Sequence, residues 1–421
     1  MLILAIISIA GLTYLAYAAT RTALFPPVLF SGTWLLSLVG LGLFGRLFYP
    51  ISGESYLVYI VGAASFTVGG FLGLVATARS EQRYDNHNHA RNTARLTLIA
   101  LDIALIVVIG GIPLYWHQVA RTAGDLPLPL LLQHVRFVAV EATGEPRSFS
   151  LVGNLVVLAQ IVAVVMFYED DKCAARRARA ILAIVAAIIY GALSGAKGTA
   201  VVLVLTLFFV SWIRSGEVKI KTVLITLGGS LSLFAIGLLL VNYAFVSFSD
   251  FSAVPSALAK TLANYWLGGL VAFDYAMPKL HTMESTQTAA RFFLESAAGL
   301  GAHVSVPNVH AEYTAISQDM DTNTYTIYFS YFKDFGWFGM SVLLVLLGAA
   351  LTALFRDAAR RRPVALILYS MLCAGLALSF HAEHLLLGLN GYIKAWLFLF
   401  LLYHLIPGLG RRSQHRALLG A

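Results

Sequence analysis

Three basic residues stand between long apolar stretches of the chain, where a cation could bind an anion close to a membrane. Arg136 lies in LLQHVRFVAVEATG, Lys197 in LSGAKGTA and Arg291 in TQTAARFFLES. A guanidinium matches the oxygens of a phosphate with a planar set of donors, and the glycines beside Lys197 let a large group approach the backbone. We interpret all three as candidate phosphate ligands. The alternative is that they anchor or solvate loops at the membrane interface.

A second group of residues could accept a proton. His310, Glu312 and Asp321 lie in the polar stretch before residue 336, and histidines and carboxylates are the usual general bases. His303 would add a ligand to His310 and Glu312 for a metal ion, but the set is small and Pro307 interrupts any helix. We therefore expect a solvated loop and no metal.

A third polar group, HAEHLL at 381–386, places His381, Glu383 and His384 beside an apolar run. We expect it to form a short polar turn that caps two helices. The motifs of soluble enzymes are absent, because the chain contains no GxGxxG after a strand, no P-loop, no HExxH and no GxSxG. Any chemistry must therefore come from side chains held at the ends of apolar segments.

The composition is that of a membrane protein. Of the 421 residues, 59% are hydrophobic and 12% are charged, whereas a soluble domain carries about 25% charged residues. Helices of about 20 apolar residues cross about 30 Å of hydrocarbon. We predict an all-α polytopic protein that forms a single integral membrane domain over residues 1–421.

Hydropathy divides the chain into about eleven spans and two longer polar segments. The polar segments, about 117–149 and 245–335, are expected to form a cap on the outer side, with an amphipathic helix at 254–277 on the membrane surface or packed over the bundle. The pair 180–193 and 199–213 is short and forms a tight hairpin or a broken helix. The predicted spans are 2–19, 28–48, 56–77, 96–116, 150–168, 180–193, 199–213, 222–244, 336–355, 364–380 and 390–407.

The net charge of +8 is mostly a topology signal. With these spans, 19 of the 29 Lys and Arg residues fall on one side and 10 on the other. Cytoplasmic loops carry the excess of Lys and Arg, so we expect the N-terminus outside and the C-terminus in the cytoplasm. We expect no nucleic-acid partner.

The stretch TNTYTIYFSYFKDFGWFG, 322–339, holds eight aromatic residues directly before an apolar run. An aromatic belt at the water–lipid interface would explain Tyr325, Tyr328, Tyr331 and Trp337. It does not explain Asn323 or Asp334. Gly336 and Gly339, one helical turn apart, are expected to allow close helix packing.

This stretch resembles the signature of bacterial oligosaccharide repeat-unit polymerases, the Wzy-type O-antigen polymerase family. The pattern N-x-Y-T, several aromatics, then D-F-G-x-x-G matches Asn323, Tyr325, Thr326, Asp334, Phe335, Gly336 and Gly339. Arg136 matches an arginine that follows a Leu-rich stretch in this family, and 194–199 matches a turn between two spans. A Tyr-rich segment at 265–273 also agrees.

The resemblance implies a polymerase of undecaprenyl-diphosphate-linked oligosaccharides on the outer face of the bacterial inner membrane, acting by inverting transfer without metal, cofactor or nucleotide sugar. Its partners would be the lipid-linked oligosaccharide, membrane lipid and a chain-length regulator. The implied roles are diphosphate binding by Arg136, Lys197 and Arg291; general base catalysis by Asp321, Glu312 or His310; and sugar positioning by Asn323 and Tyr325, with Asp334 fixing the loop to the helix.

Two departures from the family pattern leave alternatives open. Lys197 stands where arginine is usual and lacks the planar fork. Thr322 stands where related O-antigen ligases carry a histidine, so no base is assigned there. The near alternative is a ligase that transfers polysaccharide to lipid A core. The alternatives from other classes are a lipid-linked oligosaccharide flippase, which would have charges near the bilayer midplane and an internal repeat, and a scaffold without chemistry.

Overall fold

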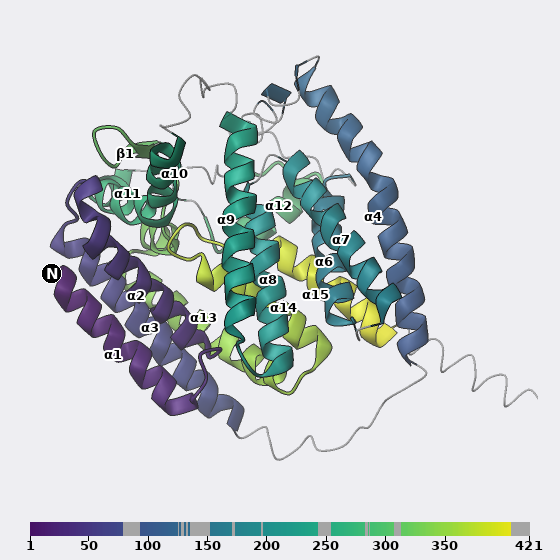
Figure 1. Ribbon diagram of the computed structural model, residues 1–421. Coiled ribbons are helices and arrows are strands. Elements are labelled where there is room, and N and C mark those ends of the chain that lie inside the picture. Colours follow the sequence, from purple (N-terminus) through teal and green to yellow (C-terminus); the bar gives the residue numbers. More distant parts are fainter. Residues whose placement is uncertain are drawn as a thin grey trace, which may run out of the picture.

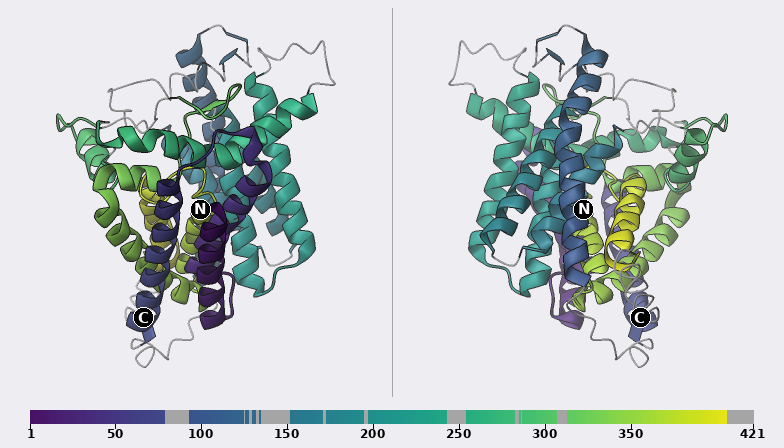
Figure 2. Two further views of the ribbon diagram at one scale, coloured as in Figure 1. Left: turned by 90° about the vertical axis from the view of Figure 1, so that its left-hand side faces the viewer. Right: turned by 90° about the vertical axis from the view of Figure 1, so that its right-hand side faces the viewer.

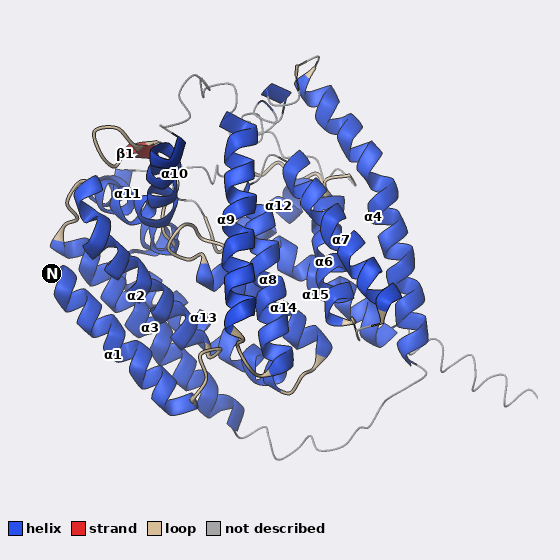
Figure 3. Ribbon diagram, viewed as in Figure 1, coloured by secondary structure: helices blue, strands red, loops and turns tan. Residues whose placement is uncertain are grey.

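The computed structural model (Figure 1) describes residues 1–78, 93–124, 126–127, 130–131, 134, 152–170, 173–194, 197–242, 254–282, 285, 287–306 and 313–405. Nearly all of this is helix, as Figure 3 shows. The helices are α1 Leu2–Thr20, α2 Pro26–Phe44, α3 Gly53–Ala78, α4 Thr93–Ala123, α6 Asn154–Tyr168, α7 Ala174–Leu193, α8 Lys197–Ser215, α9 Ile220–Asn242, α10 Val254–Ala263, α11 Gly269–Ala276, α12 Arg291–Gly299, α13 Ile327–Ala359, α14 Pro363–Ala377 and α15 Leu389–Phe400.

Shorter elements complete the described chain. Two-residue strands β1 (Thr314–Ala315) and β2 (Asp321–Thr322) pair antiparallel, with Thr314 opposite Thr322. The 3-10 turns are Gly45–Leu47 and Met277–Thr282, and the π-helical segments are Asn264–Gly268 and Leu401–Leu405.

Each predicted span overlaps a helix, and the all-α membrane character is confirmed. Among the described residues, six helices are long and apolar enough to cross a membrane. The long apolar side chains of α1, such as Ile3, Ile7 and Leu15, are exposed, which suits lipid and not water. The number of spans and the outer position of the long loops stay predictions.

The helices α1, α2, α3 and α13 pack around aromatic side chains; we call them the aromatic bundle. Phe30 stacks on Phe66 with ring centroids 4.4 Å apart, and Trp34 lies 4.4 Å from Tyr328. The Tyr59 hydroxyl donates to the Leu270 carbonyl of α11 at 2.9 Å. Buried aromatic pairs add stabilisation beyond their area, so this bundle is a rigid support for the elements above it.

Glycine lets α3 and α13 meet backbone to backbone. A Cβ atom on Gly69 would overlap the Val345 carbonyl, and one on Gly348 would overlap the Phe66 carbonyl. Small residues permit such close approach between membrane helices. The close contact between α3 and α13 therefore depends on Gly69 of α3 and Gly348 of α13. It does not depend on the two glycines of the aromatic stretch.

The prediction for those two, Gly336 and Gly339, is wrong. Gly336 has φ 61° and ψ −165°, so α13 is broken there into two helical pieces. Side chains other than hydrogen rarely tolerate this conformation. A Cβ on Gly336 would meet nothing within 4 Å, and one on Gly339 would meet Phe335 of its own helix. Gly336 serves a turn in the chain and not contact with a neighbouring helix.

Helices α4, α6, α7, α8, α14 and α15 share a core rich in alanine and valine; we call them the aliphatic bundle. The Tyr190 hydroxyl donates to the Val108 carbonyl at 2.9 Å and joins α7 to α4. Helix α14 contacts α8 in this bundle and α2 and α13 in the other, and the Tyr369 hydroxyl donates to the Leu24 carbonyl. Helix α14 therefore joins the two bundles.

The predicted amphipathic helix at 254–277 forms α10, the π-helical segment Asn264–Gly268 and α11. Its residues 267–273 are buried, so it packs over the aromatic bundle. Figures 1 and 2 show α10, α11 and β1 at the end of the molecule where α9 ends and α13 begins. This end carries the candidate site.

Candidate functional site

The aromatic stretch at the start of α13 is part of the protein core. Tyr328 and Tyr331 are fully buried and Tyr325 is nearly so. The Tyr325 hydroxyl lies 2.6 Å from the Thr314 hydroxyl of β1, and its ring stacks on Phe329 at 4.2 Å. The aromatic belt expected here is therefore wrong for these three tyrosines, because the protein itself covers them, whereas Trp337 is exposed.

Asp334 holds a neighbouring loop against α13. Its carboxylate accepts hydrogen bonds from the Ser285 hydroxyl at 2.9 Å and from the backbone amide of Thr288 at 2.7 Å. Helix α12 begins only three residues later, at Arg291. The sequence predicted that Asp334 fixes the loop to the helix, and the loop it fixes is the one that leads into a candidate phosphate ligand.

Two cations and one carboxylate, from α12 and α15, interact near the start of α6. The Arg291 Nε lies 2.9 Å from the Glu295 Oε1. The Lys394 ammonium of α15 donates to the Asn154 Oδ1 of α6 at 2.8 Å, and the Glu295 carboxylate interacts with it electrostatically. We call Arg291 and Lys394 the cation pair.

Lys394 was not among the predicted site residues. The signal in the sequence was a single charged residue inside the apolar stretch LNGYIKAWLFLF. An ionisable side chain inside an apolar helix is costly unless it has a partner or a function. That signal identifies the residue but cannot identify Asn154 or Glu295, which lie more than 90 residues away in the chain.

The candidate base Asp321 and the sugar-binding candidate Asn323 lie around β2. The Asp321 side chain is exposed, and its carbonyl accepts a hydrogen bond from the Asn264 Nδ2 at 2.9 Å. Asn323 is half-buried. The Asn264 Oδ1 is buried with no hydrogen-bond partner in the part of the chain that the structure describes. A hydrogen-bond acceptor without a described donor therefore lies close to Asp321.

Asn264 is the first residue of the π-helical segment, which positions its side chain beside β2. π-Helical turns are rare and are frequently found at functional sites. The next residue, Tyr265, stacks on His381 with ring centroids 5.3 Å apart, and its carbonyl lies 3.1 Å from the His381 Nδ1. The segment therefore connects β2 to the HAEHLL turn.

Glu383 organises the HAEHLL turn. Its buried carboxylate accepts hydrogen bonds from the Tyr331 hydroxyl at 2.7 Å and from the backbone amides of residues 385–387 at 2.8, 2.8 and 2.6 Å. Burial raises the pKa of Glu383, and these donors partly offset the rise. The expected polar turn between two helices is confirmed, and its central carboxylate is joined to the aromatic stretch of α13.

The two histidines of the turn are enclosed. Burial lowers the pKa of His381 to about 4 and, together with the nearby His381, the pKa of His384 to about 4. The His384 Nε2 is buried, and no described residue forms a hydrogen bond with it. Both side chains are therefore neutral imidazoles at neutral pH.

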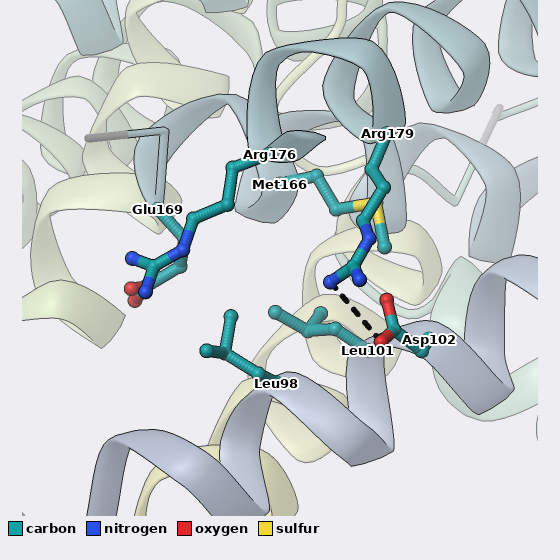
Figure 4. A pocket seen from close by; sticks show the side chains of 7 residues that line it. All are labelled: Leu98, Leu101, Asp102, Met166, Glu169, Arg176 and Arg179. Carbon is teal, nitrogen blue, oxygen red and sulfur yellow. Dashed lines mark ion pairs between the residues drawn. The ribbon is translucent and has the colours of Figure 1, made fainter. Parts of the chain in front are cut away.

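A small pocket lies at the opposite end of α6 (Figure 4). It is lined by Leu98, Leu101, Asp102, Met166, Glu169, Arg176 and Arg179, from α4, α6, the residue after α6 and α7. The Arg179 Nη1 lies 3.1 Å from the Asp102 Oδ2. No predicted site residue lines this pocket. It surrounds the last turn of α6, whereas Lys394 bonds the first residue of that helix.

The remaining predicted residues cannot be placed beside the cation pair. Arg136, His310 and Glu312 lie outside the described residues. Lys197 is the first residue of α8, and its side chain is outside the description. A shared hollow among Arg136, Lys197 and Arg291 stays a prediction. Within the described residues, no group of three or more His, Cys, Asp or Glu side chains could hold a metal ion.

Comparison with known proteins adds no assignment: no protein-family model matches the chain, and no curated protein matches its sequence.

Proposed function

We propose that this membrane protein polymerises undecaprenyl-diphosphate-linked oligosaccharide repeat units into a surface polysaccharide. The observation that carries the proposal is the bonding of Asp334 to the loop before α12. It joins the stretch that resembles the polymerase signature to the cation pair, two features that were separate in the sequence. A hydrophobic bundle with cations at one end suits a substrate that carries a lipid tail and a diphosphate.

The reaction needs a cation more than an acid. An acceptor hydroxyl oxygen attacks the anomeric carbon of the donor sugar, the bond from that carbon to the diphosphate oxygen breaks, and the hydroxyl proton passes to a base. The leaving diphosphate is already ionised, so preorganised cations stabilise its developing charge. In this proposal Arg291 binds the diphosphate, and Asp321, exposed on β2, takes the proton.

The proposed location is the bacterial inner membrane, with the cation pair on the outer face and the N-terminus outside. The distribution of arginine supports this orientation. The turn between α13 and α14 carries Arg360, Arg361 and Arg362, and it lies at the end of α13 remote from Asp334. An arginine-rich turn of this kind is typical of a cytoplasmic loop.

A flippase for the same lipid-linked oligosaccharide is the second candidate. The observation that favours it is the break of α13 at Gly336, because transporters often bind substrate at interrupted helices. A ligase would use similar cations. The position where such ligases carry histidine is Thr322, whose hydroxyl lies 2.8 Å from the Thr324 hydroxyl.

Deletion of the gene distinguishes these functions. Surface polysaccharide from the deletion strain is separated on a gel and compared with the wild type. A polymerase predicts a product with a single repeat, a ligase predicts no attached repeat, and a flippase predicts lipid-linked repeat accumulating in the cytoplasm. Only the first outcome agrees with the proposal, and a ladder of normal length overturns it.

A further inference from the structure

We propose that the His381 Nε2 accepts a hydrogen bond from a hydroxyl group of the acceptor sugar and holds that sugar near the candidate base Asp321. The inference rests on the proposed function, because the sugar is that of the incoming lipid-linked repeat. It deepens that function by assigning a sugar contact to the HAEHLL turn, which the sequence indicated only as a cap of two helices.

A backbone carbonyl fixes the position of the hydrogen on the His381 ring. The His381 Nδ1 lies 3.1 Å from the Tyr265 carbonyl oxygen. Because a carbonyl oxygen only accepts, Nδ1 carries the hydrogen and donates it. Burial lowers the pKa of His381 to about 4, so the ring is neutral at neutral pH. In a neutral imidazole the other nitrogen is then an acceptor, and the Nε2 of His381 has that role.

This acceptor has no donor within the part of the chain that the structure describes. The bond to the Tyr265 carbonyl is the hydrogen bond that His381 forms there. The buried atoms without a partner include the His384 Nε2 and not the His381 Nε2. The turn covers most of His381, but the residue keeps some exposed surface. A ligand can therefore reach the His381 Nε2, whereas the protein encloses that of His384.

Neighbouring groups hold the His381 ring in one orientation. The Tyr265 ring stacks on it with ring centroids 5.3 Å apart. Glu383, two residues later, accepts from the Tyr331 hydroxyl and from three backbone amides of the same turn. A binding group is effective when packing and hydrogen bonds fix its position. The acceptor nitrogen is therefore preorganised before a ligand arrives.

The π-helical segment brings this acceptor close to the stretch that resembles the polymerase signature. Asn264 of the segment donates to the Asp321 carbonyl at 2.9 Å. A Cβ atom on Gly269, the residue after the segment, would lie 3.6 Å from the His381 carbonyl oxygen and 3.6 Å from the Thr324 carbonyl oxygen. The HAEHLL turn and the signature stretch therefore meet at this glycine.

The chemistry of the acceptor selects the class of ligand. A neutral imidazole nitrogen needs a donor, and the oxygens of an ionised phosphate are acceptors themselves. Sugar hydroxyl groups donate, and an oligosaccharide repeat carries several of them. His381 binds one of these hydroxyls, and a second hydroxyl, the attacking one, is left to Asp321.

The experiment measures binding of the free repeat-unit oligosaccharide, released from the lipid-linked precursor of the same organism, to the purified full-length protein in nanodiscs. A second arm uses inorganic pyrophosphate. His381→Asn puts an amide nitrogen where Nδ1 stands, so it keeps the donor to Tyr265 and removes the acceptor. His381→Gln and His381→Met are similar in length, and only Gln offers an acceptor oxygen. His303→Asn, at an exposed residue, is the control.

The expected losses are confined to the sugar. His381→Asn weakens oligosaccharide binding about fivefold, as expected for one hydrogen bond, and leaves pyrophosphate binding unchanged. His381→Gln binds the oligosaccharide about fivefold more tightly than His381→Met. His303→Asn behaves as the wild type. In polymer formation, His381→Asn raises the KM for the lipid-linked repeat about fivefold with kcat unchanged, which is the result of losing a binding contact.

The structural alternative is that His381 only fastens the turn to the π-helical segment. It predicts wild-type oligosaccharide binding by His381→Asn and equal binding by His381→Gln and His381→Met, and either result overturns the inference. Equal weakening of oligosaccharide and pyrophosphate binding also overturns it. A fall in kcat of about 10²–10⁴-fold at unchanged KM would make His381 the general base and overturn its role as a binding contact.

Folding of each variant is verified by size-exclusion chromatography, and the pair His381→Gln and His381→Met supplies the test if His381→Asn does not fold. Failure of the inference can be told apart from failure of the proposed function. If His381→Asn loses oligosaccharide binding but the deletion strain keeps normal polysaccharide, the sugar contact stands and the polymerase function fails. If the deletion strain makes a single repeat but His381→Asn binds normally, the polymerase stands and the role of His381 fails.

Discussion

The two ends of α6 carry the same chemical groups in different arrangements. At the Lys394 end, polar groups are enclosed and bonded several times, as in the Glu383 turn. At the Arg179 end, Arg179 and Asp102 form a one-to-one pair with exposures of 44% and 38%. Exposed pairs contribute little stability, whereas enclosed polar groups cost much free energy unless they are satisfied or used. The comparison therefore favours the Lys394 end as the place of the proposed binding site.

The largest expected effect separates the two ends by activity. Arg291→Ala should lower the rate of polymer formation by about 10²–10³-fold, the size seen when one preorganised charge-stabilising donor is removed. Arg179→Ala should leave the polysaccharide ladder unchanged, because its guanidinium is paired at the remote end of α6. The measurement is the ladder in a deletion strain complemented by each variant at matched expression.

Two outcomes would break the comparison. Equal loss of long chains in both variants would mean that the ends do not differ in function. Normal ladders in both would remove Arg291 from the site. The conservative variant Arg291→Lys retains charge without the planar fork, so intermediate chain lengths from it indicate a phosphate contact.

The sequence predicted the positions of the helices better than the contacts between them. Uncharged apolar runs located the helices, because burial in hydrocarbon requires about 20 apolar residues in a row. The same rule could not separate a core tyrosine from an interfacial one, so Tyr328 and Tyr331 were misplaced. Periodicity also gave no sign of the break at Gly336, since the residues on both sides favour helix and the backbone angle of one glycine leaves no pattern.

The functional roles assigned to the candidate residues stay predictions. Asp334 was recognised as a residue that fixes a loop, since the motif placed an acid at the start of an apolar run. Lys394 was missed, because its bond to Asn154 depends on how α15 packs against α6. Side-chain types show what chemistry is available, whereas the contacts between elements distant in the chain decide which groups act together.

The second prediction tests how strongly the Lys394 end depends on its enclosed carboxylate. Glu383→Ala leaves the Tyr331 hydroxyl and three backbone amides without their acceptor. Loss of several bonds at a buried site should lower the free energy of unfolding by about 4 kcal/mol. Thermal unfolding in detergent measures the change. Tyr331→Phe is the matched control and removes a single donor, with an expected loss of about 1 kcal/mol.

The third prediction uses the pKa values of the enclosed histidines. Those of His381 and His384 are lowered from 6.5 to about 4, so the unfolded chain binds more protons than the folded one between these values. The contribution of these two neutral histidines to the free energy of unfolding is therefore fully present above pH 6.5 and is lost as pH falls toward 4. At pH 5.5 the two together should lower the free energy of unfolding by about 3 kcal/mol relative to pH 7.5.

The control for this prediction is the double variant His381→Gln and His384→Gln, in which the loss of stability between pH 7.5 and 5.5 should largely disappear. Glu383 and Tyr392 face the same turn. Glu383 becomes less costly to bury when protonated, because its pKa is raised by burial, so it opposes the loss at acid pH. A pH dependence that survives in the double variant would place the sensitive groups elsewhere.

The smallest effect is expected at the Arg179 end. Both partners of its pair are more than one third exposed, so water screens their attraction and the side chains lose entropy in pairing. A double-mutant cycle with Arg179→Ala and Asp102→Ala should give a coupling free energy below about 1 kcal/mol. The measurement is thermal unfolding of the wild type, both single variants and the double variant. A coupling of about 3 kcal/mol would show that this end is as tightly organised as the Glu383 turn, and exposure would then no longer separate the two ends of α6.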